Sequence, residues 1–196
     1  MSRPVAILRP EPGNAATVTR VRAAGLDAIA LPLFVIRALD WDAVDGAAHD
    51  ALLLTSANAI RHGGAGLGSV RSLPTFAVGH ATATAARGAG FVIAATGDGD
   101  AATTLTVARE RGFRRLLHLA GRDRSIAATD IVAATRAVYA SEPLDIAPDV
   151  LAGLADSVAV LHSVRAARRL GELLDAAAID RASVRLAAIA PAVRDA

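Results

Sequence analysis

Two serines each follow a short apolar segment, in a position that could bind an anion. Ser56 follows residues 51–54 and Ser163 follows residues 158–161, and each begins a stretch with helical periodicity. A serine at such a point can simply cap the helix, as it does at many helix starts. At the carboxyl end of a parallel strand, the free N–H groups of the next helix also bind anions. The residues alone leave both interpretations open.

Tyr139 is the only tyrosine of the chain and lies in a β-branched stretch, residues 131–140. Its phenol could donate a proton to a leaving group. From position alone, Tyr139 is also consistent with a half-buried strand residue whose hydroxyl contacts water.

Other common sources of catalytic chemistry are missing. The chain has no cysteine, no Walker motif and no Gly-x-Ser-x-Gly elbow. The glycine-rich residues 63–68 follow a predicted helix and lack the spacing of a dinucleotide site, so we expect a flexible loop. Asp40 is expected to cap a short helix through Val44, with Asp42 and Asp45 on its solvated face.

The histidines also lack metal-ligand spacing such as H-E-x-x-H. They are His49, His62, His80, His118 and His162. We therefore expect no metal and no cofactor. An enzyme built from these residues would work by orienting a reactive substrate.

Composition indicates a folded chain without a membrane or nucleic-acid role. Of 196 residues, 53% are hydrophobic and 20% are charged, which is too apolar for a disordered chain. The net charge is +2 and the arginines are scattered, so nucleic acid is not an expected partner. No apolar run approaches the ~20 residues that span a bilayer. Residues 1–12 do not form a secretory signal, and we expect a cytoplasmic protein.

Short apolar runs alternate with helical patterns along the chain. Strands are predicted at residues 5–8, 28–31, 51–54, 75–78, 91–95, 116–120, 131–140, 158–161 and 184–189. Helices are predicted at residues 14–24, 56–62, 80–89, 101–111, 148–155 and 163–174, and from residue 191 onward. This alternation favours an α/β fold whose parallel sheets have helices on both faces.

The chain also contains an internal similarity. Residues 53–61 align with residues 160–168, and residues 77–83 align with residues 188–194 in the same order. Residues 53–61 and residues 160–168 each contain a predicted strand, then a serine at the turn, then alanine and arginine at the start of a helix. The sequence therefore predicts two α/β units of the same kind.

Several short motifs, taken in order, resemble those of the uroporphyrinogen-III synthase family. Each is weak alone, but together they follow the family's order over nearly the whole chain. The matching segments are Leu8-Arg9-Pro10, Leu31-Pro32-Leu33, Thr55-Ser56-Ala57-Asn58-Ala59, Val78-Gly79-His80-Ala81-Thr82-Ala83, Leu119-Ala120-Gly121-Arg122-Asp123-Arg124, Val138-Tyr139, Leu161-His162-Ser163 and Ala188-Ile189-Ala190-Pro191.

The resemblance implies two similar parallel-sheet domains, flavodoxin-like or Rossmann-like, with one inserted in the other. Residues 1–34 and 141–196 would form the first domain and residues 36–138 the second. Residues 34–39 and 134–140 would form a two-stranded linker. The chain stops where the second domain has further elements, so we expect either a truncated sequence or a first domain that is shortened at its C-terminal end.

The resemblance also implies a reaction. The family is a cyclising hydro-lyase of tetrapyrrole (haem) biosynthesis. It converts hydroxymethylbilane, a linear tetrapyrrole, to uroporphyrinogen III, with inversion of ring D and loss of water. The bilane ionises its own hydroxymethyl group, and ring D then attacks to give a spiro intermediate. A monomer without cofactors is expected, with the bilane handed over by hydroxymethylbilane synthase.

Site residues follow from the resemblance, position by position. Ser56, Thr82 and Ser163 would lie in the cleft between the domains, and Tyr139 would be the general acid for the leaving hydroxyl. Because the substrate carries acetate and propionate groups, helix N-termini and arginine are the expected partners. The substrate-binding candidates are Arg9, Ser56, Ala57, Asn58, Gly79, His80, Thr82, Gly121, Ser163, Val164, Arg165, Pro191 and Ala192.

The last turn departs from the family pattern. Ala192 and Val193 stand where the family has hydroxyl residues, so this turn would bind substrate through backbone N–H groups alone. Ala190 replaces the family's glycine, so we expect the backbone to approach a ligand less closely.

Two other functions remain compatible with the residues. A non-catalytic two-domain protein that binds a small anionic ligand would share the serine-capped helices but would not need Tyr139. A synthase-like module that acts as an interaction partner is the third interpretation.

Overall fold

The computed structural model describes residues 2–42, 44–123, 126 and 129–196 and divides into two compact units. Unit 1 consists of Met1–Val35 and Glu142–Ala196, and unit 2 is Ile36–Ser141. The chain passes from one unit to the other within two strands, β3 (Phe34–Ala38) and β8 (Val132–Pro143).

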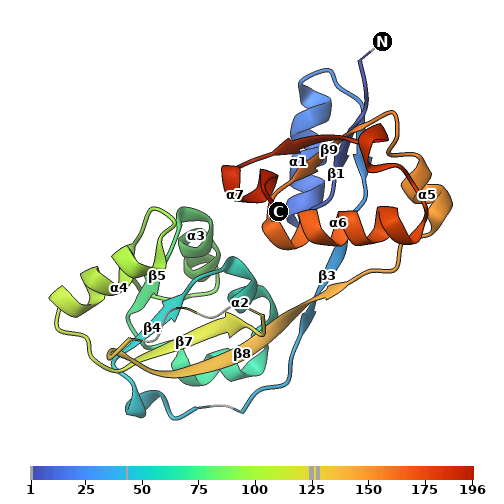
Figure 1. Ribbon diagram of the computed structural model, residues 1–196. Helices are drawn as coiled ribbons and strands as arrows, with labels where there is room; N and C mark the ends of the chain where they lie inside the picture. The colour runs from blue at the N-terminus through green and yellow to red at the C-terminus, as the bar shows by residue number, and fades with distance from the viewer. Residues whose placement is uncertain (1, 43, 124–125, 127–128) are drawn as a thin grey trace. The chain divides into compact units, whose positions relative to one another are not determined.

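Unit 1 contains a parallel sheet in the order β10-β9-β1-β2. Its strands are β1 (Val5–Ile7), β2 (Ala28–Ala30), β9 (Val158–Leu161) and β10 (Arg185–Ala188). Its helices are α1 (Gly13–Ala23), α5 (Pro148–Ala152), α6 (Val164–Ala176), α7 (Pro191–Arg194) and the 3₁₀ turn η3 (Arg181–Ser183). In Figure 1 the blue N-terminal segments therefore lie beside the orange and red C-terminal ones.

The core of unit 1 depends on the amphipathic helix α6. Its residues Ala166, Leu170, Leu173 and Leu174 recur at helical spacing and are all buried. They belong to one apolar cluster with side chains from both ends of the chain, including Leu8. The apolar side of α6 thus packs against a sheet whose strands are far apart in the sequence.

Unit 2 contains a larger sheet in the order β3-β8-β7-β4-β5-β6. Its other strands are β4 (Ala51–Leu54), β5 (Thr75–Ala77), β6 (Ile93–Thr96) and β7 (Leu116–Gly121). The pairs from β8 through β6 are parallel. The helices are α2 (Ala57–His62), α3 (His80–Gly88) and α4 (Ala101–Glu110), with the 3₁₀ turns η1 (Gly46–Ala48) and η2 (Ala65–Val70).

Both faces of this sheet are covered. Along β4, Leu52 and Leu54 belong to one apolar cluster with residues of α2 and α3, and Leu53 belongs to a second cluster with residues of α4. Because side chains alternate between the faces of a strand, a fully apolar β4 serves both clusters. The predicted fold class, parallel α/β sheets in two similar units, is confirmed.

The strand orders explain the internal similarity. The order β10-β9-β1-β2 in unit 1 corresponds to β5-β4-β7-β8 in unit 2. Ser163 after β9 and Ser56 after β4 therefore follow equivalent central strands. In unit 2, β6 lies beyond β5, whereas β10 is the edge of its sheet and all four of its residues are exposed.

Two local predictions are wrong. No helix occurs among the described residues between Asp40 and Val44; instead, the Asp45 carboxylate accepts a hydrogen bond from the N–H of Ala47 and caps η1. The glycine-rich segment is not a flexible loop, because residues 65–70 form η2 with Leu67 and Val70 buried. The expectation for Arg124 in the third family motif lies outside the described residues.

Asn14 connects the end of β1 to the first turn of α1. Its side chain is fully buried, and Nδ2 donates to the carbonyl oxygens of Ile7 at 2.7 Å and Arg9 at 3.1 Å. This amide therefore holds the turn from which Arg9 projects.

We predict that Asn14→Asp destabilises the protein more than Asn14→Ala. Alanine removes two hydrogen bonds and leaves a small void, at a cost of about 1–3 kcal/mol. Aspartate adds a buried acceptor that faces two carbonyl oxygens without a donor, which costs more. Urea denaturation gives both values, and equal stability of the two variants would contradict this account.

Candidate functional site

The candidate residues of unit 2 lie at the carboxyl edge of its sheet. Ser56 follows β4, Gly79 follows β5, and Gly121 ends β7. These three strands are parallel neighbours, so their carboxyl ends meet at one edge, where open α/β sheets bind ligands. The set at this edge is Ser56, Ala57, Asn58, Gly79, His80, Thr82, Gly121 and Tyr139.

The remaining candidates lie at the corresponding edge of unit 1. Arg9 follows β1, Ser163 follows β9 and Pro191 follows β10. This second set is Arg9, Ser163, Val164, Arg165, Pro191 and Ala192. The structure thus brings the predicted residues together in two sets, one in each unit.

Both serines cap their helices. Ser56 Oγ accepts a hydrogen bond from the N–H of Asn58 and Ser163 Oγ accepts one from the N–H of Ala166, each at 3.2 Å. Each hydroxyl thereby satisfies one of the N–H groups that a helix start leaves free, and the other N–H groups of the first turn remain available. Helix α6 is 13 residues long, whereas α2 has six, so the dipole at Ser163 is the larger of the two.

The starts of α3 and α7 share one backbone conformation without a side-chain cap. Gly79 has φ −160° and ψ 163°, and Ala190 has φ −154° and ψ 154°. Both are extended, so alanine fits the turn at 190 without strain. A Cβ added at Gly79 would meet no atom within 4 Å. Within the first turn of α3, His80 is exposed and Thr82 is buried.

Tyr139 is more buried than a half-buried strand residue. Its side chain is 4% exposed and belongs to the cluster with Leu52 and Leu54. Its strand position pairs with Gly121, and a Cβ at Gly121 would lie 2.8 Å from Cε2 and Cζ of the ring. Glycine at 121 is therefore required for the ring to lie there.

The Tyr139 hydroxyl has no hydrogen-bond partner among the residues that the structure describes. The His62 ring lies near it, with the centroids 6.4 Å apart and the planes tilted by 41°. Burial, and then the charge of Arg61, lower the pKa of His62, which favours a neutral imidazole beside the phenol.

The unit 1 set has a cationic character that sequence reasoning found only in part. Burial lowers the pKa of His162, and the charges of Arg9 and Arg20 lower it further. Arg165, another candidate, places its guanidinium 4.6 Å from the centre of the Phe34 ring. Arg20 and His162 were not among the predicted site residues, because the sequence does not show that the charges of Arg9 and Arg20 both act on His162.

A hydrogen bond in unit 2 was also missed. His118, on β7, is 1% exposed, and its Nε2 lies 3.1 Å from Oγ1 of Thr55. Burial lowers the pKa of His118 to about 4, so the ring is neutral near pH 7. These residues are 63 positions apart, and only the pairing of β4 with β7 brings them together.

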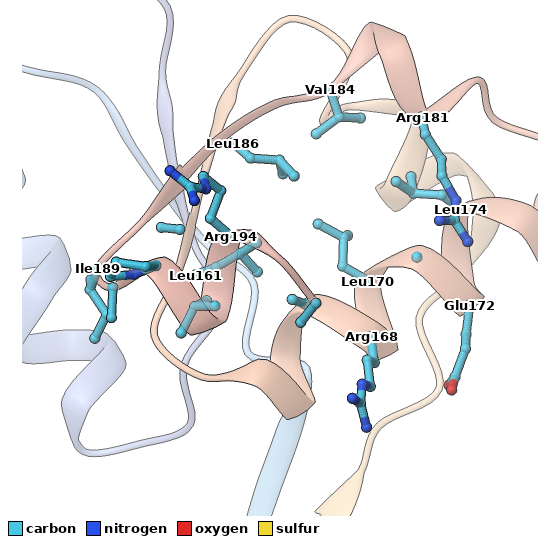
Figure 2. Close-up of a pocket in the computed structure, with 17 residues that line it drawn as sticks. Leu161, Arg168, Leu170, Glu172, Leu174, Arg181, Val184, Leu186, Ile189 and Arg194 are labelled. Carbon is cyan, nitrogen blue, oxygen red and sulfur yellow. The ribbon is translucent and has the colours of Figure 1, made fainter.

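A cavity of about 710 Å³ opens in unit 1 among α6, β10 and α7. Figure 2 shows Leu170 of α6 and Leu186 of β10 facing each other across it. Of the candidate residues, only Pro191 lines this cavity. The cavity therefore does not coincide with the carboxyl-edge set of unit 1.

Two further features concern the described part of the chain alone. No helix there is both long and apolar enough to cross a lipid bilayer. No three histidine, cysteine or acidic side chains there come close enough together to hold a metal ion.

The fold and its edges define a two-unit α/β protein whose candidate ligand groups lie at strand ends. The family model described as "Uroporphyrinogen-III synthase HemD" matches residues 15–196. The chain therefore belongs to the uroporphyrinogen-III synthase family, lyase-type enzymes of tetrapyrrole biosynthesis. No curated protein sequence matches the chain.

Solved structures show the same fold. A mutant uroporphyrinogen III synthase from the extremely thermophilic bacterium Thermus thermophilus is similar with a TM-score of 0.62 and 17% identity, over 99% of this chain and 89% of that one. Uroporphyrinogen-III synthetase from Helicobacter pylori is similar with a TM-score of 0.65 and 13% identity, over 98% of this chain and 86% of that one.

We predict that His118 makes stability depend on pH between 6.5 and 4. The pKa is about 4 in the folded protein and 6.5 in the unfolded chain, so only the unfolded chain binds the proton in this window. The free energy of unfolding therefore falls as the pH falls through it, and it is fully retained above pH 6.5. At ~1.4 kcal/mol per unit, the loss reaches about 3 kcal/mol near pH 4.

Urea denaturation of the wild type and of His118→Gln measures this contribution. Glutamine does not titrate, so the free energy of unfolding of this variant should lack the loss of about 3 kcal/mol between pH 6.5 and 4. Any contribution of His62 and His162 is common to both proteins and cancels in the difference. Parallel profiles for the two proteins would show that His118 is not the source.

Proposed function

We propose that this chain is a uroporphyrinogen-III synthase, a cyclising hydro-lyase that converts hydroxymethylbilane to uroporphyrinogen III. Ring D is inverted in the product and water is lost. The observation that carries the proposal is the family match over residues 15–196. The non-catalytic anion-binding protein is not favoured, because the family is one of enzymes.

Positioning of the two ends of the bilane is the main catalytic contribution in this proposal. The bilane supplies its own leaving group and also cyclises without an enzyme, to the uninverted isomer. Holding reacting groups in place contributes ~7–11 kcal/mol, whereas one general acid contributes ~10²–10⁴-fold in rate. The chain therefore needs to impose one geometry more than to supply a strong nucleophile.

The carboxylates of the bilane provide the points by which it is held. We assign them to backbone N–H groups at the helix starts of both units and to the Arg9 guanidinium. Support comes from the long helix α6 behind Ser163, the uncapped start of α3 behind Gly79, and the cations around His162. N–H groups that no side chain satisfies are suited to many carboxylates without a dedicated residue for each.

Tyr139 is assigned as the proton donor to the departing hydroxyl. Its ring is held by packing and by the close approach to Gly121, while its hydroxyl makes no bond to any described residue. A phenol fixed in this way can give its proton to the leaving oxygen and take one back afterwards.

The proposed setting follows from the reactivity of the substrate. Because free hydroxymethylbilane cyclises to the wrong isomer, direct handover from hydroxymethylbilane synthase would protect it. We place this step in the cytoplasm and assign the active form as a monomer.

The decisive experiment supplies enzymatically generated hydroxymethylbilane and separates the isomers of the product. Uroporphyrinogen III above the background of the uninverted isomer supports the proposal. Formation of the uninverted isomer alone, at the rate seen without protein, would reject it in favour of a binding protein.

We predict that Tyr139→Phe lowers the rate by ~10²–10⁴-fold, the usual contribution of a general acid. The substitution keeps the ring and therefore most of the packing. The product that still forms should be the inverted isomer, because geometry selects the carbon that is attacked. Single-turnover kinetics with isomer analysis measures both, and an unchanged rate in a folded variant removes Tyr139 from the mechanism.

We predict that Ser56→Ala and Ser163→Ala each have mild effects. Each loses one capping hydrogen bond, at a cost of about 1 kcal/mol in stability. The backbone donors remain, so kcat/KM should fall by less than about tenfold. Complete loss of turnover in either folded variant would contradict the assignment of binding to the backbone.

A further inference from the structure

His118 and Thr55 meet on one face of the unit 2 sheet. In the register of β4 and β7, Leu53 pairs with His118, and Thr55 lies two residues further along the chain than Leu53. Residues two apart in a strand direction share a face, which explains why His118 Nε2 lies 3.1 Å from Thr55 Oγ1. His118 is 1% exposed, so this hydrogen bond is shielded from water.

The surroundings of the ring determine which nitrogen carries its proton. A neutral imidazole has one N–H, on either Nδ1 or Nε2. His118 Nδ1 is buried and has no partner in the described part of the chain. A proton on Nδ1 would be a buried donor without an acceptor, whereas a proton on Nε2 is donated to Thr55 Oγ1 and leaves only a lone pair unpaired. The Nε2–H tautomer is therefore favoured.

This tautomer determines the direction of the Thr55 hydroxyl. Once Oγ1 accepts from His118, the hydroxyl must place its own proton elsewhere, and none of the described residues accepts it. Thr55 is half-buried and directly follows β4, at the edge where parallel sheets bind ligands. The pair therefore presents a hydrogen-bond donor, with a fixed direction, at that edge.

We propose that His118 is a positioning residue that holds the Thr55 hydroxyl as a hydrogen-bond donor to a carboxylate of the substrate. This inference rests on the proposed function for the identity of the ligand. Thr55 is the residue that contacts the ligand, and His118 acts through it.

The tautomer can be tested without any ligand. Long-range ¹H–¹⁵N correlation spectra of histidine-labelled protein distinguish a proton on Nε2 from one on Nδ1. The proposal requires the Nε2–H form for His118 at pH 7. An Nδ1–H form would make Thr55 the donor to His118 and would overturn the proposal.

The contribution to binding is measured with uroporphyrin III, a stable polycarboxylate, by fluorescence titration, and with the KM for hydroxymethylbilane. Thr55→Val should raise both constants about tenfold, the effect of losing a hydrogen bond to a charged group, with kcat nearly unchanged. Thr55→Ser should restore both. Thr75→Val is the matched control. This fully buried threonine begins β5, away from the carboxyl edge of the sheet, and its hydroxyl donates to the Leu73 carbonyl.

Substitutions of His118 test whether it acts through Thr55. His118→Leu should weaken binding as much as Thr55→Val does, His118→Gln should recover most of it, and the double variant His118→Leu with Thr55→Val should be no weaker than either single variant. Additive losses, or wild-type affinity in Thr55→Val, would overturn the proposal. Should His118→Leu not fold, the Thr55 series and the tautomer decide.

The two proposals fail in different ways. A wild type that binds uroporphyrin III but forms no uroporphyrinogen III would reject the proposed function, while the dissociation constants of the variants would still decide the role of His118. A wild type that does not bind the polycarboxylate would overturn the role of His118.

Discussion

Parallel pairing around a central strand is the constraint on which the rest of the molecule depends. In unit 2, β4 lies between β5 and β7, and in unit 1, β1 and β9 are central. A parallel sheet must be buried on both faces, and every strand must be followed by a crossover that returns over one of them. The carboxyl ends of the parallel strands in each unit therefore meet at one edge of its sheet, and the turns that follow them are placed to bind a ligand. The serines, Gly79, Gly121 and Arg9 owe their positions to strand direction.

The elements that depend on local pattern could be predicted from the sequence. A run such as residues 51–54 is apolar at every position, which is what a strand buried on both faces requires. Helix starts at Ser56 and Ser163 were also predictable, because capping involves only the next few residues. The repetition of both signals made it possible to infer two similar units.

Features that depend on long-range pairing could not be predicted in this way. The bond between His118 and Thr55 exists only because β7 lies beside β4, and the strand order has no local signature. The glycine-rich segment was expected to be flexible from its composition, but its apolar residues Leu67 and Val70 are buried in the core. Burial of a few side chains outweighs the entropy that glycine loses on ordering. Asp45 likewise competes with Asp40 as a cap, and the sequence does not show which of them is used.

The insertion of unit 2 affects the order in which the chain folds while the ribosome is making it. Strands β1 and β2 leave the ribosome before unit 2 does, but β1 pairs on its other side with β9, which follows residues 36–141. Until β9 is made, Ala6 and Leu8, which are fully buried in the finished protein, lack most of their core and β1 has an open edge. Unit 2 is continuous in sequence and can fold in the meantime, since domains generally fold as units during synthesis. Strand β1 therefore reaches its final pairing only after the whole of unit 2 has been synthesised, although it precedes that unit in the sequence.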